Sequence, residues 1–217
     1  YTITPKVLGG LACAGPSVVV VISIDPVPVV SSAATKSICS GVSVNYVPTA
    51  AVAGTVFNWT SSVTVGTVTG NTAVGGLGTI ADVLVNTTNV IGTVRYVITP
   101  VANGCSGTPF NVDVTVDPQP TLSTVVTPLS QVLCSNTAMV IDVNSATVPS
   151  AGSVVYDYVA VASDVSVTGF TASAINQSLA TNISNLNVLN SSLIRQTITY
   201  TITPKVLGGL ACAGPSV

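Results

Sequence analysis

The sequence predicts an all-β protein built from tandem two-sheet sandwiches, and three observations support this fold class. Val and Thr dominate the chain, and their branched side chains favour strands over helices. Short segments of alternating polarity are separated by turn signals such as Ala53-Gly54 and Asn103-Gly104. Finally, residues 1–18 recur unchanged at 200–217, which sets a repeat period of 199 residues and is typical of a tandem array.

A second, weaker repeat divides each period into two modules. The segments 96–100 (YVITP), 105–107 (CSG) and 112–120 (VDVTVDPQP) follow the same order as 1–5 (YTITP), 13–15 (CAG) and 20–28 (VVISIDPVP). The two Asp-Pro-x-Pro signatures lie 92 residues apart, so each module has the size of one domain with its own core. We therefore expect residues 1–25 to be the closing strands of a preceding module, 26–117 to form module one, and 118–217 to form module two.

Alternating polarity predicts the individual strands. It is clearest at residues 42–46, 93–98, 111–116, 139–143 and 196–202, where one face of each strand is expected to be buried and the other wet. Residues 173–193 are rich in Asn and Ser and are expected to form a strand pair with irregular loops. The prolines of Asp-Pro-x-Pro cannot donate to a ladder, so they end one module and stiffen the step to the next.

The low content of charged residues narrows the functional classes. Charged residues make up 6% of the chain, against about a quarter in ordinary domains, and the mean hydropathy is +0.71. No apolar run approaches the ~20 residues that span a bilayer, so no membrane insertion is expected. Two interpretations stay open: Thr and Ser cover the outer faces, or part of those faces is buried against other chains. The net charge of −2 predicts no affinity for nucleic acid.

The cysteines follow the weaker repeat. Cys39 opens module one and Cys105 lies near its end, while Cys134 and Cys212 take the same places in module two. This placement predicts the disulfides Cys39–Cys105 and Cys134–Cys212, with buried free thiols as the alternative. Cys13 is then one half of a pair whose partner belongs to a preceding module. Disulfides indicate an oxidising, extracellular destination.

No residue pattern indicates an enzyme, a metal site or a cofactor. The chain has no His and no Glu, and no Asp lies near a plausible nucleophile, so a general base is missing. No CxxC pair or carboxylate cluster offers metal ligands. Trp59 follows Cys39 at a distance that suits a core residue beside a disulfide, and Tyr158 holds the same place in module two. We interpret both as core residues, with a ligand contact as the alternative for Trp59.

Several motifs of module one resemble those of a known family. The segments 54–60 (GTVFNWT), 93–100 (TVRYVITP), 104–107 (GCSG) and 114–118 (VTVDP) are similar to the PKD-like, immunoglobulin-like repeats of giant Bacteroidota surface proteins. The resemblance covers residues 26–120, and module two keeps only its ends. It implies tandem immunoglobulin-like (PKD-like) β-sandwiches, export by the type IX route and a role in adhesion or surface filaments. It supplies no catalytic residues.

The repeat and the resemblance together predict a structural repeat unit of an extracellular adhesive filament or stalk on a bacterial surface. Its expected partners are further copies of the repeat in the same chain, and the low charge favours lateral homo-oligomers in a fibre. The alternative is a carbohydrate- or protein-binding immunoglobulin-like module of a gliding-type adhesin. That alternative predicts exposed aromatic side chains on one set of loops, but the chain has few aromatic residues, most of them within strand patterns.

Overall fold

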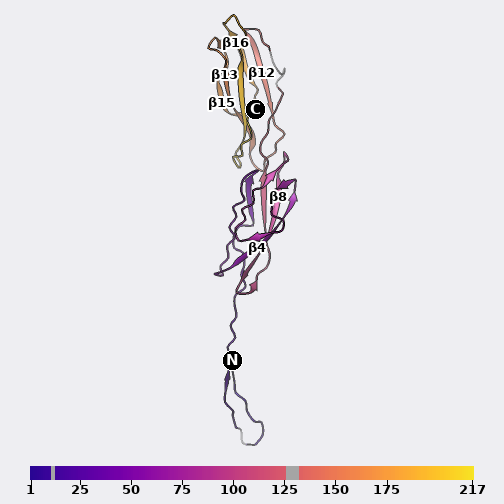
Figure 1. Cartoon of the computed structure of the whole chain (residues 1–217), viewed down its shortest axis with the longest axis vertical. Coiled ribbons are helices and arrows are strands. Elements are labelled where there is room, and N and C mark those ends of the chain that lie inside the picture. Colours follow the sequence, from indigo (N-terminus) through magenta and orange to yellow (C-terminus); the bar gives the residue numbers. More distant parts are fainter. Residues whose placement is uncertain (11–12, 126–131) are drawn as a thin grey trace.

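The computed structural model describes residues 1–10, 13–125 and 132–217, and its regular structure is made of β-strands. Two sandwich modules are stacked end to end along the long axis of the molecule, and an extended hairpin projects beyond module one (Figure 1). No helix in the described part of the chain is long and apolar enough to cross a membrane. The predicted all-β fold of tandem sandwiches is confirmed.

Module one has one large sheet and a smaller facing layer. The strands of the large sheet lie in the order β3 (Thr35–Cys39), β10 (Phe110–Asp117), β8 (Gly92–Ala102), β4 (Val56–Val65) and β6 (Gly76–Leu77), with β9 (Cys105–Ser106) also paired to β8. The facing layer contains β5 (Val68–Thr69) paired with β7 (Val85–Asn86). The strand expected at 42–46 does not form a continuous ladder. Only Ser43 and Tyr46 make isolated bridges there, to Val83 and Ile80, because Asn45 adopts a positive φ of 42° that interrupts the extended backbone.

Strict alternation along β8 and β10 explains the core of module one. Every second side chain of β8 from Gly92 to Ala102 is buried, as the sequence pattern requires of a strand with one wet face. Val112, Val114 and Val116 of β10 are fully buried beside them. Trp59 is also buried and packs edge to face on Tyr96, with ring centroids 5.6 Å apart.

Module two has two sheets that face each other. One has the order β11 (Ser123–Val125), β12 (Thr137–Asn144), β16 (Ile183–Asn190) and β14 (Val167–Thr168), and the other has β15 (Ser173–Ser178), β13 (Ser153–Ala162) and β17 (Ile198–Leu207). The strand pair expected within 173–193 corresponds to β15 and β16, which lie in different sheets. The core side chains come from both sheets and include Met139, Ile141, Tyr156, Tyr158 and Ile202.

A polar clip recurs in both modules and shows that they share one design. In module one, the Ser40 hydroxyl and the Asn86 backbone exchange hydrogen bonds of 3.3 and 2.9 Å, and the Asn86 amide donates to the Val90 carbonyl. In module two, Ser135 and Asn190 exchange bonds of the same two lengths, and Asn190 donates to Ile194. Ser40 follows Cys39 and Ser135 follows Cys134. The two opening cysteines are therefore structurally equivalent.

Residues 1–10 and 13–25 form a separate hairpin. Within the described residues, its strands β1 (Thr2–Ile3) and β2 (Val18–Val19) pair only with each other, and most of the described side chains are exposed. A side-chain hydrogen bond to module one runs from the Asn103 side-chain amide to the Asp25 carboxylate, at 3.3 Å. The hairpin thus stands apart from the core of residues 26–117.

Replacing Trp59 with Ala should lower the free energy of unfolding of module one by about 3–5 kcal/mol, because the change leaves a cavity beside Tyr96. Urea unfolding followed by circular dichroism measures the effect. Val74→Ala is the matched control, since Val74 is 93% exposed and its loss should change little. Equal effects of the two substitutions would contradict the core assignment.

Candidate functional site: the junction between the modules

A disulfide joins the two modules. It links Cys39 at the end of β3 to Cys212, which follows β17, with the two Cα atoms 5.6 Å apart. The predicted pairings Cys39–Cys105 and Cys134–Cys212 are therefore wrong. Cys13, Cys105 and Cys134 are free thiols in this structure, and Cys13 and Cys134 are exposed.

Strand geometry explains why the predicted pair in module one cannot form. Cys39 lies opposite Asp117, beyond the Gly92 end of β8, whereas Cys105 pairs with Ala102 at the other end of that strand. A strand of this length spans about 33 Å, and a disulfide requires Cα atoms within about 7 Å. In module one, the opening and closing cysteines therefore lie at opposite ends of the sandwich. Cys39 is the one that faces module two.

Hydrogen bonds surround the disulfide at the junction. The Val148 amide donates to the Asn89 carbonyl at 2.7 Å, which joins a loop of module two to a loop of module one. The Ser150 amide donates to the carboxylate of Asp117 at 3.1 Å, and this aspartate is fully buried. The junction is thus a packed interface with a covalent link, and the Asp-Pro-x-Pro segment passes through it.

Close packing against proline recurs at the two ends of module one. Gly214 lies so near Pro120 that a Cβ atom would come within 1.7 Å of the proline carbonyl oxygen. Gly107 lies against Pro28 in the same way, with a corresponding distance of 1.9 Å. Only glycine fits either position. The link that leads into module one is therefore built like the link that leads into module two.

The repeated sequence forms the same hairpin in two different environments. In both copies the same local contacts occur: Lys6 bridges Ala14 as Lys205 bridges Ala213, and Thr4 bonds Ser17 at 2.8 Å as Thr203 bonds Ser216 at 2.7 Å. Burial differs completely. Ile3 is 59% exposed, whereas its counterpart Ile202 is 3% exposed against β13 and the core of module two. Local sequence therefore fixes the hairpin, and the sandwich supplies its burial.

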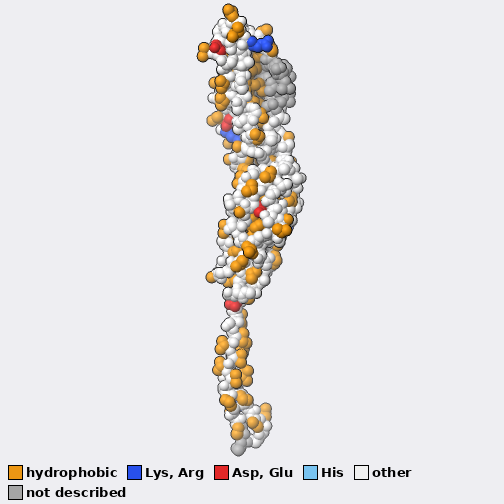
Figure 2. Space-filling view, in the orientation of Figure 1, with side chains coloured by type: hydrophobic (Ala, Val, Ile, Leu, Met, Phe, Trp, Pro, Cys, Tyr) orange, Lys and Arg blue, Asp and Glu red, His pale blue; other side chains and the backbone are white. Residues whose placement is uncertain are grey.

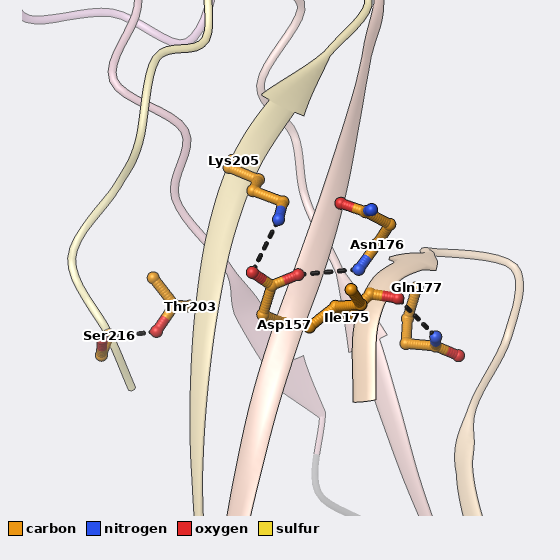
Figure 3. A network of polar contacts seen from close by, with 7 residues as sticks. All are labelled: Asp157, Ile175, Asn176, Gln177, Thr203, Lys205 and Ser216. Carbon is orange, nitrogen blue, oxygen red and sulfur yellow. Dashed lines mark hydrogen bonds and ion pairs between the residues drawn. The ribbon is translucent and has the colours of Figure 1, made fainter. Parts of the chain in front are cut away.

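An ion pair anchors the docked copy of the hairpin. The Lys205 ammonium donates to the Asp157 carboxylate of β13 at 2.7 Å. The backbone amide of Asn176 donates to the other carboxylate oxygen, also at 2.7 Å (Figure 3). Burial alone would raise the pKa of Asp157, but the hydrogen bonds from Lys205 and Asn176 and the lysine charge hold it below its usual value. In module one, Arg95 binds Asp113 through two hydrogen bonds and likewise lowers the pKa of that carboxyl.

A tyrosine in the core of each module has a raised pKa. Tyr96 donates to Asp82 at 2.8 Å, and burial together with this carboxylate raises the pKa of the phenol. Burial, followed by the nearby Tyr158, raises the pKa of Tyr200 to about 12. In the described ranges, no group of three or more acidic or cysteine side chains could hold a metal ion.

Non-reducing peptide mapping should recover one disulfide-linked peptide that joins Cys39 to Cys212. In Cys39→Ser this peptide should disappear. The free energy of unfolding should fall by up to about 5 kcal/mol, because the disulfide closes a long loop between residues 173 positions apart. Cys105→Ser is the matched control and should keep the cross-link. A dominant Cys39–Cys105 peptide would contradict the junction.

The pair Asp157–Lys205 should stabilise module two by at most about 1 kcal/mol at pH 7, because both side chains are partly exposed. The pKa of Asp157 is lower in the folded than in the unfolded state, so this stabilisation is present above about pH 4 and is lost as the pH falls through the folded pKa. A double-mutant cycle with Asp157→Asn and Lys205→Met, measured at pH 7 and pH 2, tests this. Equal coupling at both pH values would refute the assignment.

Comparison with known proteins agrees with this architecture. No curated protein matches the chain. The family model of the PKD-like domain matches two consecutive segments, residues 36–120 and 131–217, which together cover most of the chain. Each segment corresponds to one of the two sandwiches. The chain therefore belongs to the PKD-like domain family and contains two such domains in tandem.

Proposed function

We propose that this chain is a structural repeat unit of an extracellular adhesive filament or stalk on a bacterial surface. The disulfide across the module junction is the observation that carries the proposal. A covalent bond, one backbone–backbone hydrogen bond and one hydrogen bond to a buried aspartate at the same boundary restrain bending between the modules. Such a joint suits a spacer that holds a distal tip away from the cell. The disulfide also fits an oxidising compartment outside the cell.

The equivalence of the cysteines extends this joint to every boundary of an array. Cys39, the opening cysteine of module one, binds Cys212, the closing cysteine of the following module. By the same rule, Cys134 binds Cys105 of the next period, and Cys13 binds Cys39 of the preceding one. Every cysteine then has a partner, and each boundary between modules carries one disulfide.

Lateral association of copies is the second part of the proposal. The chain has five Lys and Arg, and two of these, Arg95 and Lys205, are already in ion pairs. The outer face of β13 carries Val159 and Val161, which are 54% and 62% exposed. Figure 2 shows apolar side chains spread along the whole visible face with few charges between them. Chains packed side by side would bury these faces and give avidity at the tip.

A chain of two periods tests the array. It consists of residues 1–217 followed by a second copy of residues 19–217. Its maximum dimension in X-ray scattering should exceed that of one period by about 70–90 Å, as expected for two sandwiches placed end to end. Peptide mapping should show Cys134 of the first period bound to Cys105 of the second, and Cys134→Ser should remove only this bond.

A compact two-period particle, or free thiols at both of these positions, would refute the array. Electron microscopy of the native fibre tests lateral packing, since a fibre only one module wide, about 20–25 Å, would exclude it.

A further inference from the structure

Module two contains an apolar cavity at the position that β10 occupies in module one. Its volume is about 790 Å³, and four strands contribute apolar side chains to its lining: Met139, Ile141, Val167, Val188, Ile198 and Tyr200. Ile198 and Tyr200 correspond to Val94 and Tyr96 of module one. Those two residues lie opposite β10 residues and are fully buried. In module one, β10 covers this part of the core. In module two, the same part of the core is the cavity.

The edge of β17 beside this cavity is prepared for strand pairing. Within its sheet β17 pairs with β13, whereas the equivalent strand β8 lies between β4 and β10. Val217 already exchanges backbone hydrogen bonds of 2.9 and 2.8 Å with Ile202, at the register that Phe110 and Ile98 hold in module one. In an antiparallel ladder, the backbone groups of alternate residues face the same edge of the strand. The backbone amides of Tyr200 and Ile198 therefore point toward the same edge as that of Ile202, where residues following Val217 would pair.

Residues 18–25 have the sequence and the register that this edge requires. Residues 20–25 (VVISID) correspond to residues 112–117 (VDVTVD) of β10, so Val20, Ile22 and Ile24 stand where the buried Val112, Val114 and Val116 stand. In the free hairpin, Tyr1 and Val20 exchange two backbone hydrogen bonds of 2.8 Å, as the opposed pair Tyr96 and Val112 requires. Ile22 is 63% exposed in that hairpin.

We propose that the cavity of module two is a strand acceptor and that its occupant is residues 19–25 of a second copy of the repeat, which continue the chain from Val217, the counterpart of Val18. This inference rests on the proposed array, which places that copy directly after Val217. The strand would lie antiparallel to β17 and insert its equivalents of Val20, Ile22 and Ile24 between the sheets. Its end would reach Cys134, which lines the cavity, just as Asp117 lies opposite Cys39. Strand insertion therefore completes the core and sets the next junction.

The test compares the 217-residue chain with the same chain extended after Val217 by a second copy of residues 19–25. Hydrogen exchange should slow at least about tenfold at the amides of Ile198 and Tyr200, because both become donors in a ladder. The melting midpoint of module two should rise by about 10 °C or more, since three apolar side chains enter the core. Unchanged exchange at these two amides in the extended chain would overturn the proposal.

Two variants of the extension check the register. Ile22→Asp places a charge in the core and should abolish both the protection and the rise in midpoint. Val21→Asp is the matched control, because Val21 corresponds to Asp113, whose side chain points outward in module one. It should keep both effects. Equal behaviour of the two variants would refute the inserted register.

This experiment separates the inference from the function on which it rests. Slowed exchange at Ile198 and Tyr200 in the extended chain, together with a compact two-period particle, would support the strand acceptor and refute the end-to-end array. An extended two-period particle without protection of Ile198 and Tyr200 would retain the end-to-end array and reject the acceptor.

Discussion

In module one, β10 lies between β8 and β3 and inserts Val112, Val114 and Val116 between the two layers. This pairing is the interaction on which the rest of the molecule depends. It closes the core over Tyr96 and Val94, and it holds Cys39 beside the end of β10, where the chain leaves for module two. With so few charges, burial of branched side chains between the sheets is the main source of stability.

The repeated hairpin separates what is local from what is tertiary. Its backbone bonds, its Thr–Ser contact and its Lys–Ala bridge are the same in both copies. The same apolar face is exposed in one copy and buried in the other, so the hairpin forms without the sandwich. The stability that comes from burying this face requires the sandwich. The free copy therefore leaves exposed an apolar face that the docked copy buries against module two.

The junction joins the two sandwiches covalently. Because Cys39 and Cys105 lie at opposite ends of a strand about 33 Å long, they cannot bond each other, and Cys39 bonds the closing cysteine of module two instead. A disulfide at each boundary, with strand donation from the following period, would give every module a covalent and a hydrogen-bonded link to the next. Tension along such a fibre would act on links distributed along its whole length.

The sequence by itself determined most of the strands, the tandem modules and the period, because alternation, turn residues and internal repeats can be read directly from it. It also placed Trp59 and Tyr158 in strand patterns that the structure buries. It did not show that Asn45 interrupts the strand expected at 42–46, or that the strands within 173–193 belong to different sheets. It did not determine the disulfide. Sequence order put Cys39 and Cys105 in one module, but only the tertiary structure showed that β8 separates them and that Cys212 approaches Cys39 from the next sandwich. The physical reason is that pairing depends on distances between strand ends, which topology fixes and sequence spacing does not.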